Sequence, residues 1–505
     1  MRSPRIELDT VNDARPVRWW EWAGVLVCAA LFLALRWPLY VRPGLLLGWH
    51  SDAALLGLMA RAIAAGDYPI LFWGADYLAP LTSVFAALVG STFVDGIGPL
   101  ALRLGTAIEV FAAIVFFQFG LRRAAGRRAA LLATFWLTAG PAFLFKLTYA
   151  PLSAEQYFFL GAVTFWYVTR APFDRLHRWL ILGLLAGIGW WIHRGVTFVV
   201  LPSLLTILLF DRDALRARRE QLAAAFAFLG GAIFGALPIV FGKLMIDQRL
   251  YIPVKTGWSL AHVESRIYET FRFDAWELLG AHGFAWSWLL GITFVALLVS
   301  AAVHFRARRT AVLAAGVLAT TLAFWLLSTD AYQGAVRYVM IALPILYAFA
   351  AQELVRLWDR RSVASRALAI VGMAIVCASL YIPRYAQAQN AAAGLLEQHE
   401  HWPGGFDPRP ALRDVAAGHY TVCYANVWVA HKLEWLSDTN VRFIPYRSVN
   451  RRMVDSMRLA KLPGPKCFVN LKGQVRPLTK TEEADLRLEI LWHAKGWRRD
   501  APSLE

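Results

Sequence analysis

Long continuous apolar runs, separated by short charged segments, are the main pattern along this chain of 505 residues. Runs of about fifteen to twenty-odd residues can cross the hydrocarbon core of a bilayer, about 30 Å thick, as helices. The pattern therefore predicts a mainly α, polytopic membrane protein. We expect about eleven transmembrane helices, in the runs 21–40, 99–121, 129–146, 154–169, 179–192, 195–210, 222–243, 286–304, 310–328, 337–355 and 364–382.

The segment 78–94 is also apolar, and the charges of the loops decide whether it crosses. If it does not cross and the N-terminus is cytoplasmic, all the arginine-rich loops fall on the cytoplasmic side, as the positive-inside rule requires. We therefore expect 78–94 to be a helix at the outer face and 53–65 to be a second interfacial helix. The arginine-rich loops are RRAAGRR (122–128), RAPFDRLHR (170–178), DRDALRARR (211–219), FRARR (305–309) and RLWDRRSVASR (356–366).

This orientation puts the loops 41–98 and 244–285 and the C-terminal part on the outer side. We divide the chain into a membrane domain, 1–384, and an extracytoplasmic α/β domain, 385–505. The second domain has strand-like segments and one helical segment. Its two cysteines, Cys423 and Cys467, can form a disulfide if this part lies outside the cytosol. The expected strands are 421–429, 441–446 and 466–471, and the expected helix is 431–438.

Composition narrows the class of protein. Hydrophobic residues make up 58% of the chain and charged residues 17%, with a mean hydropathy of +0.45. The net charge of +17 raises the question of nucleic acid, but the excess arginine lies largely in short loops, so we expect no nucleic-acid partner. The first apolar run is too long for the core of a cleavable signal peptide, and we expect it to remain as a signal anchor.

Few residues are candidates for chemistry. Asp52 precedes an interfacial helix and is interpreted either as its N-terminal cap or as a catalytic carboxylate. Glu109 falls inside a predicted span, where an ionisable group is a functional candidate, although a buried hydrogen bond explains it equally well. The sequence has no phosphate-binding glycine loop and no nucleophile motif. His50 and Asp52 alone are a weak metal pair, so we expect no cofactor, with a divalent cation possible but not favoured.

The stretch from 54 to 105, ALLGLMARAIAAGDYPILFWGADYLAPLTSVFAAL and then GPLALRLG, resembles the GT-C membrane glycosyltransferases. It is most similar to the branch of protein O-mannosyltransferases and lipid A aminoarabinose transferases. In that fold the first outer loop carries interfacial helices and an acidic residue that acts as the general base or binds the acceptor. The resemblance assigns this role to Asp52. The mannosyltransferases have an Asp-Glu pair there, whereas this chain has Ser51 and Asp52, which argues against protein mannosylation.

A second segment, QGAVRYVMIALP (333–344), has an Arg-Tyr pair like that of many of these transferases. The resemblance makes Arg337 a candidate for the carrier phosphate, because a guanidinium group binds phosphate oxygens with two hydrogen bonds. An ordinary interfacial arginine is the alternative. Further donor-side candidates are Tyr338, Lys146, Arg194 and His193. Candidates for the acceptor or the cavity are Asp76, Tyr77, Glu155, Lys255 and Arg266.

The hypothesis is an inverting transfer of a sugar from a polyprenyl-phosphate donor on the extracytoplasmic face of a bacterial inner membrane, with Asp52 as the general base. The acceptor is an envelope glycan, lipid or protein, and membrane lipids are the surroundings. A transporter or flippase of a lipid-linked or anionic precursor is the alternative, and a non-catalytic scaffold of envelope assembly is a third possibility. The sequence does not identify the sugar, the acceptor or the oligomeric state.

Overall fold

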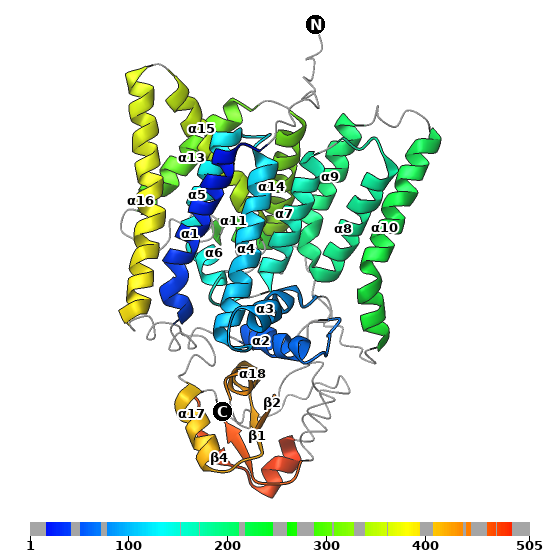
Figure 1. Ribbon diagram of the computed structural model, residues 1–505, viewed down its shortest axis with the longest axis vertical. Coiled ribbons are helices and arrows are strands. Elements are labelled where there is room, and N and C mark those ends of the chain that lie inside the picture. Colours follow the sequence, from blue (N-terminus) through cyan, green and yellow to red (C-terminus); the bar gives the residue numbers. More distant parts are fainter. Residues whose placement is uncertain are drawn as a thin grey trace.

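A bundle of helices with a small sheet beyond one end forms the protein (Figure 1). We call the end of the bundle that faces the sheet the domain end, and the opposite end, where the first helix begins at Trp19, the far end. The computed structural model describes residues 17–41, 51–71, 78–151, 153–170, 172–211, 218–245, 260–269, 287–305, 308–327, 339–360, 362–393, 408–437, 441–445, 462–470 and 472–486.

Apolar helices form the bundle, and their shared core is lined by alanine, leucine and aromatic side chains. The helices are α1 (Trp19–Val41), α4 (Pro99–Leu121), α5 (Arg127–Ala139), α6 (Ala142–Leu147), α7 (Ala154–Arg170), α8 (Leu176–Ile192), α9 (Thr197–Phe210), α10 (Arg218–Met245), α11 (Leu260–Glu269), α13 (Ser287–Val303), α14 (Arg309–Leu327), α15 (Leu343–Asp359) and α16 (Val363–Ala393). Short 3₁₀ turns, η3 (Arg194–Val196) and η7 (Met340–Ala342), precede α9 and α15.

Within the described ranges, 6 helices are long and apolar enough to cross a bilayer. They are α1, α4, α10, α14, α16 and the unit of η7 with α15. Several further apolar helices, such as α8 and α13, are shorter. The chain is thus a mainly α, multi-pass membrane protein, as the sequence predicts, and the expected count of about eleven spans is not confirmed.

The predicted span 129–146 is the clearest departure from the sequence expectation, because it is broken into α5 and α6. Gly140 has a positive φ of 69°, which favours glycine. Pro141 follows and has no amide hydrogen to continue the helix. The break allows α6 to run separately toward the loop before α7 at the domain end (Figure 1).

Two short helices, α2 (Ser51–Ala64) and α3 (Leu81–Thr92), lie at the domain end between the bundle and the sheet (Figure 1). They correspond to the two helices that the sequence predicts to be interfacial. Almost every residue from Ala53 to Ala60 is buried, and α3 packs so closely on α4 that a Cβ at Gly105 would lie 2.6 Å from the amide nitrogen of Ala86. Both helices are therefore held firmly.

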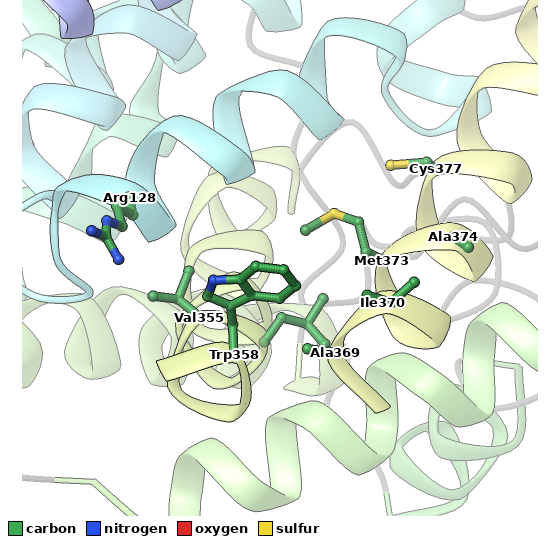
Figure 2. A pocket seen from close by; sticks show the side chains of 9 residues that line it. Arg128, Val355, Trp358, Ala369, Ile370, Met373, Ala374 and Cys377 are labelled. Atoms are coloured by element: carbon green, nitrogen blue, oxygen red, sulfur yellow. The ribbon is translucent and has the colours of Figure 1, made fainter. Parts of the chain in front are cut away.

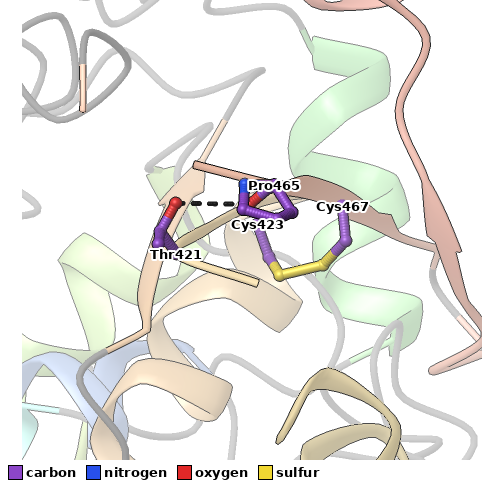
Figure 3. The surroundings of a disulfide bond; sticks show 4 residues. All are labelled: Thr421, Cys423, Pro465 and Cys467. Carbon is purple, nitrogen blue, oxygen red and sulfur yellow. Dashed lines mark hydrogen bonds between the residues drawn. A yellow bond between two sulfur atoms is a disulfide. The ribbon is translucent and has the colours of Figure 1, made fainter. Parts of the chain in front are cut away.

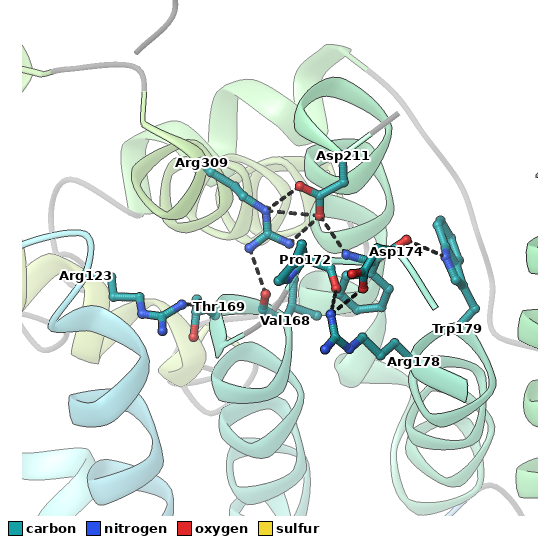
Figure 4. Close-up of polar contacts among 10 residues, drawn as sticks. Arg123, Val168, Thr169, Pro172, Asp174, Arg178, Trp179, Asp211 and Arg309 are labelled. Carbon is teal, nitrogen blue, oxygen red and sulfur yellow. Dashed lines mark hydrogen bonds and ion pairs between the residues drawn. The ribbon is translucent and has the colours of Figure 1, made fainter. Parts of the chain in front are cut away.

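At the far end, arginines in the turns between helices form ion pairs and hydrogen bonds that link neighbouring helices (Figure 4). Arg309 binds Asp211 through Nη2 at 2.7 Å and donates through Nη1 to the carbonyl of Val168 at 2.9 Å. Arg178 at the start of α8 pairs with Asp174. These contacts join α7, α8, α9 and α14, and each of these arginines is matched by a carboxylate.

The C-terminal part has a four-stranded sheet of order β2-β1-β3-β4. Its elements are α17 (Pro408–Ala417), β1 (Val422–Ala425), α18 (Val427–Leu436), β2 (Arg442–Pro445), β3 (Lys466–Val469) and β4 (Val475–Pro477). Strands β2 and β3 pair in parallel with β1, and β4 is antiparallel to β3. The predicted α/β character is present. The proposed boundary at residue 384 falls inside α16, which continues to Ala393.

One predicted strand is shorter than expected, because residues 427–429 belong to α18. The carbonyl of Asn426 accepts hydrogen bonds from the amides of Val429 and Ala430 and starts the helix there. The valines of this segment favour strands by propensity, but their packing in the helix overrides that preference. Cys423 and Cys467 lie opposite one another on β1 and β3 and form a disulfide (Figure 3).

Candidate functional site

Three buried arginines gather near the domain end of the bundle. Arg36 comes from the last turns of α1, Arg103 from the first turns of α4 and Arg384 from the second half of α16. Their side chains are 0%, 1% and 5% exposed, respectively. Two of them contact one aromatic ring, since the guanidinium carbons of Arg36 and Arg384 lie 4.4 Å and 5.7 Å from the centre of Phe145 on α6. The break before α6 supplies this shared ring.

Backbone carbonyls and neutral side chains orient these guanidinium groups. Arg36 donates to the carbonyl of Thr138 at 2.7 Å and to Oγ1 of Thr148 at 2.9 Å. Arg103 donates to the carbonyl of Tyr40 at 2.9 Å. These hydrogen bonds fix the direction of each charged group and leave its positive charge in place.

Arg384 is held by a short chain of polar groups. It donates to Gln387, which in turn donates to the hydroxyl of Tyr149. Its Nε is buried and has no hydrogen-bond partner within the described residues. Among the residues that the structure describes, neither Arg36 nor Arg384 forms an ion pair. A buried charge without a counter-ion is costly, so Arg36 and Arg384 suit a ligand that brings negative charge.

Two buried carboxylates meet at a second cluster, beside the start of α3. The hydroxyl of Thr82 donates to Oε2 of Glu109 at 2.8 Å and lies 3.4 Å from Oε1 of Glu155. Glu155 also accepts from the amide of Ser153 at 3.0 Å. Glu109 and Glu155 are both 0% exposed. The hydroxyl of Thr82 on α3 thus lies between a carboxylate of α4 and a carboxylate of α7.

Asp52 lies in the first turn of α2, where both of its sequence interpretations place it, and it is half-buried. A carboxylate at this position is stabilised by the positive end of the helix. The C-terminal domain covers one face of α2, because the ring of Trp435 on α18 is part of the same apolar cluster as Ala53 to Ala60.

His193 and Arg194 lie in the turn between α8 and α9. Nδ1 of His193 accepts from the amide of Gly195 at 2.9 Å, and its ring stacks on Tyr157 at 4.6 Å between centres. Arg194 lies over the ring of Trp190 at 5.8 Å. Lys146 is half-buried on α6, one residue from Phe145.

The remaining candidates fall outside the described residues. These are Arg337, Tyr338, Asp76, Tyr77 and Lys255, and for Arg266 on α11 the side chain is outside them. Arg36, Arg103 and Arg384 are not among the residues predicted from the sequence. The signal was nevertheless present for the first two, because an ionisable residue inside a predicted span is a functional candidate by the criterion applied to Glu109.

The larger apolar cavity of the described residues lies away from the arginine cluster. This cavity, of about 570 Å³, lies toward the far end between α5, α15 and α16, and its lining is apolar except for Arg128 at one side (Figure 2). Arg128 pairs there with Asp359. No group of three or more potential metal ligands occurs among the described residues.

Comparison with solved structures shows the fold. The chain is similar to ArnT from Cupriavidus metallidurans bound to undecaprenyl phosphate, with a TM-score of 0.57, 14% identity and coverage of 89% of this chain and 93% of that one. It also matches the apo state of that protein, with a TM-score of 0.52, 13% identity and coverage of 89% and 92%. The protein therefore has the GT-C fold, which confirms the resemblance seen in the sequence. No family model and no curated protein sequence matches the chain.

Proposed function

We propose that this protein is a glycosyltransferase that takes its sugar from a polyprenyl-phosphate donor at the domain end of the bundle. The observation that carries the proposal is the cluster of Arg36, Arg103 and Arg384, three buried positive charges in a GT-C fold. ArnT, which shares this fold, was solved with undecaprenyl phosphate. We take the domain end as extracytoplasmic, because the arginine-rich loops then lie on the cytoplasmic side.

In this proposal the donor phosphate lies against the arginine cluster. Guanidinium groups form charge-assisted hydrogen bonds with phosphate oxygens and stabilise the charge that develops on the leaving group. The acceptor hydroxyl oxygen forms a bond to the anomeric carbon while the bond from that carbon to the phosphate oxygen breaks. The polyprenyl phosphate leaves with the bonding electrons, and the configuration at the anomeric carbon inverts.

Asp52 is the proposed base that receives the proton of the acceptor hydroxyl. Its position in the first turn of a buried interfacial helix supports this role. General-base assistance of this kind accelerates a reaction about a hundred- to ten-thousand-fold. Glu155 and Glu109, which share Thr82, are buried in the protein, and we assign them a structural role in holding α3 against α4 and α7.

The test uses purified protein in lipid nanodiscs with a panel of polyprenyl-phosphate sugars and cell-envelope acceptors. It measures the release of polyprenyl phosphate and the gain of sugar on the acceptor. Asp52→Asn should reduce turnover at least about a hundredfold and leave donor binding intact. Asp67→Asn is the matched control, because Asp67 is an exposed acid just after α2.

The phosphate site is tested by donor binding. Arg384→Gln should weaken donor binding about tenfold or more, since a hydrogen bond to a charged group contributes about 1.5–3 kcal/mol. Arg366→Gln, an exposed arginine at the far end of the same helix, should bind the donor as the wild type does. Equal donor binding by Arg384→Gln would refute the phosphate site. Donor binding without release, unchanged in Asp52→Asn, would favour the transporter or flippase.

A further inference from the structure

Gln387 on α16 links the arginine cluster to the turn after α6. Its side-chain oxygen accepts a hydrogen bond from Nη1 of Arg384 at 2.7 Å, and its side-chain nitrogen donates to the hydroxyl of Tyr149 at 3.2 Å. Gln387 and Arg384 are three residues apart on one helix, so their side chains are neighbours on its surface. The amide thus lies between a buried guanidinium group and a tyrosine hydroxyl.

The chemistry of the two partners fixes the orientation of this amide. A guanidinium group has only donors, so it must face the oxygen of the amide. The nitrogen of the amide then donates to the hydroxyl of Tyr149. The ring of Tyr149 packs edge-on against Phe145, at 6.3 Å between ring centres. The same part of the chain therefore supplies the aromatic ring beside Arg384 and the acceptor that orients Gln387.

Among the described residues, the hydrogen-bond partners of Arg36 and Arg384 are all neutral. Backbone carbonyls and the hydroxyl of Thr148 bind Arg36, and the amide of Gln387 binds Arg384. A carboxylate has nearly the same shape as this amide, but at position 387 it would form an ion pair with Arg384 and cancel its charge. The amide holds the guanidinium group in place and leaves the charge uncompensated.

We propose that Gln387 is a positioning residue of the phosphate site, which fixes Arg384 in place and keeps its positive charge for the donor phosphate. This inference rests on the proposed function, because it takes the phosphate to lie against Arg384. Gln387 acts on the donor through Arg384 and not by direct contact. A glutamate at this position would hold the same guanidinium group and compete with the phosphate for it.

The experiment measures equilibrium binding of polyprenyl phosphate to the purified full-length protein in lipid nanodiscs, with polyprenol as the ligand that lacks the phosphate. Gln387→Glu should weaken binding of polyprenyl phosphate at least about tenfold, because the carboxylate neutralises Arg384, and should leave the binding of polyprenol unchanged. Gln389→Glu is the matched control, because Gln389 is exposed and lies two residues further along α16. It adds the same charge about 3 Å away along the helix axis and should bind polyprenyl phosphate as the wild type does.

Thermal unfolding of the same variants separates this role from a purely structural one. Gln387→Glu gives a buried positive charge a counter-ion, so its unfolding midpoint should equal or exceed that of the wild type while binding of polyprenyl phosphate falls. A residue that only supports the fold would lower both quantities when it is replaced. A lower midpoint together with weaker binding in Gln387→Glu would therefore overturn the proposal.

Gln387→Met tests the hydrogen bond without adding a charge. It should weaken binding of polyprenyl phosphate about three- to tenfold and have no further effect in the Arg384→Gln background, where there is no guanidinium group to position. Unchanged binding by Arg384→Gln would refute the proposed phosphate site itself. Weaker binding by Arg384→Gln, with unchanged binding by Gln387→Glu and Gln387→Met, would leave that site intact and overturn the role of Gln387.

Discussion

The contact between Gly57 on α2 and Trp435 on α18 is the sharpest test of how the C-terminal domain is attached. A Cβ at Gly57 would lie 2.1 Å from Cε2 and 2.3 Å from Cζ2 of the Trp435 ring. Carbon atoms in contact are normally about 3.5–4.0 Å apart. The ring would have to move by about 1.5 Å, although Trp435 is 1% exposed and enclosed by the cluster around α2. We therefore predict that Gly57→Ala forces α18 away from α2.

The magnitude follows from two opposing effects. Overpacking in a filled core costs about 1–3 kcal/mol, while glycine to alanine inside a helix stabilises by about 1 kcal/mol. Gly230→Ala on α10 is the matched control, because a Cβ there meets no atom within 4 Å. The control should show only the helix effect. The free energy of unfolding of Gly57→Ala should then lie about 1–3 kcal/mol below that of Gly230→Ala.

The assay is denaturant-induced unfolding of the protein in mixed micelles, repeated in the Trp435→Leu background. Removing the ring should relieve the clash, so Gly57→Ala should become neutral or stabilising there, as the control is. A coupling of this sign identifies the two residues as direct neighbours. An equal cost of Gly57→Ala in both backgrounds would refute the reasoning, as would a Gly57→Ala variant as stable as Gly230→Ala.

Three other regions give predictions of the same kind. Cys467→Ser should lower the stability of the C-terminal domain by about 4 kcal/mol, since the disulfide joins residues 44 apart; non-reducing thermal unfolding measures this, and an unchanged midpoint would contradict it. Hydrogen bonds from Thr479 lower the pKa of Glu482. The ionised carboxylate therefore stabilises the folded state above about pH 4, the pKa in the unfolded chain, and this stabilisation is lost as the pH falls through the lower folded pKa. In Glu482→Gln this part of the acid dependence of unfolding should be absent, and the same dependence in both proteins would count against the prediction. Gly187→Ala should destabilise the protein more than Gly230→Ala, because its Cβ would lie 2.1 Å from the carbonyl oxygen of Ala232, and a backbone atom cannot move away by a change of rotamer. Unfolding in micelles compares the two variants, and equal stability would contradict the close packing of α8 on α10.

Helices were the part of the fold that the sequence predicted best, because an apolar run long enough for the bilayer has few alternatives to a helix. The exceptions depended on local chemistry. The Gly140–Pro141 pair could have signalled the break between α5 and α6, since glycine followed by proline marks a turn. The start of α18 could not be read in this way, because its valines favour a strand and only the tertiary packing decides.

The candidate site was predicted less well, and the reason is distance along the chain. Arg36 and Arg384 are brought to the same ring of Phe145 by three helices, and no local pattern links those positions. Glu109 was noticed because it interrupts an apolar run, but its meeting with Glu155 through Thr82 requires the packing of α3 on α4. Asp52 remains a prediction from resemblance and from its place at the start of α2.

The position of Trp435 has a consequence for the order in which the chain assembles during synthesis. The apolar cluster that seats α2 includes this ring, so a helix made near the start of translation lacks part of its cover until α18 has been made. Between the two events, the nascent chain presents the face of α2 around Gly57 with no permanent neighbour. The packing of α2 is thus completed only when α18 has been made. A ribosome stalled before codon 427 would leave that face of α2 accessible to chaperones or proteases.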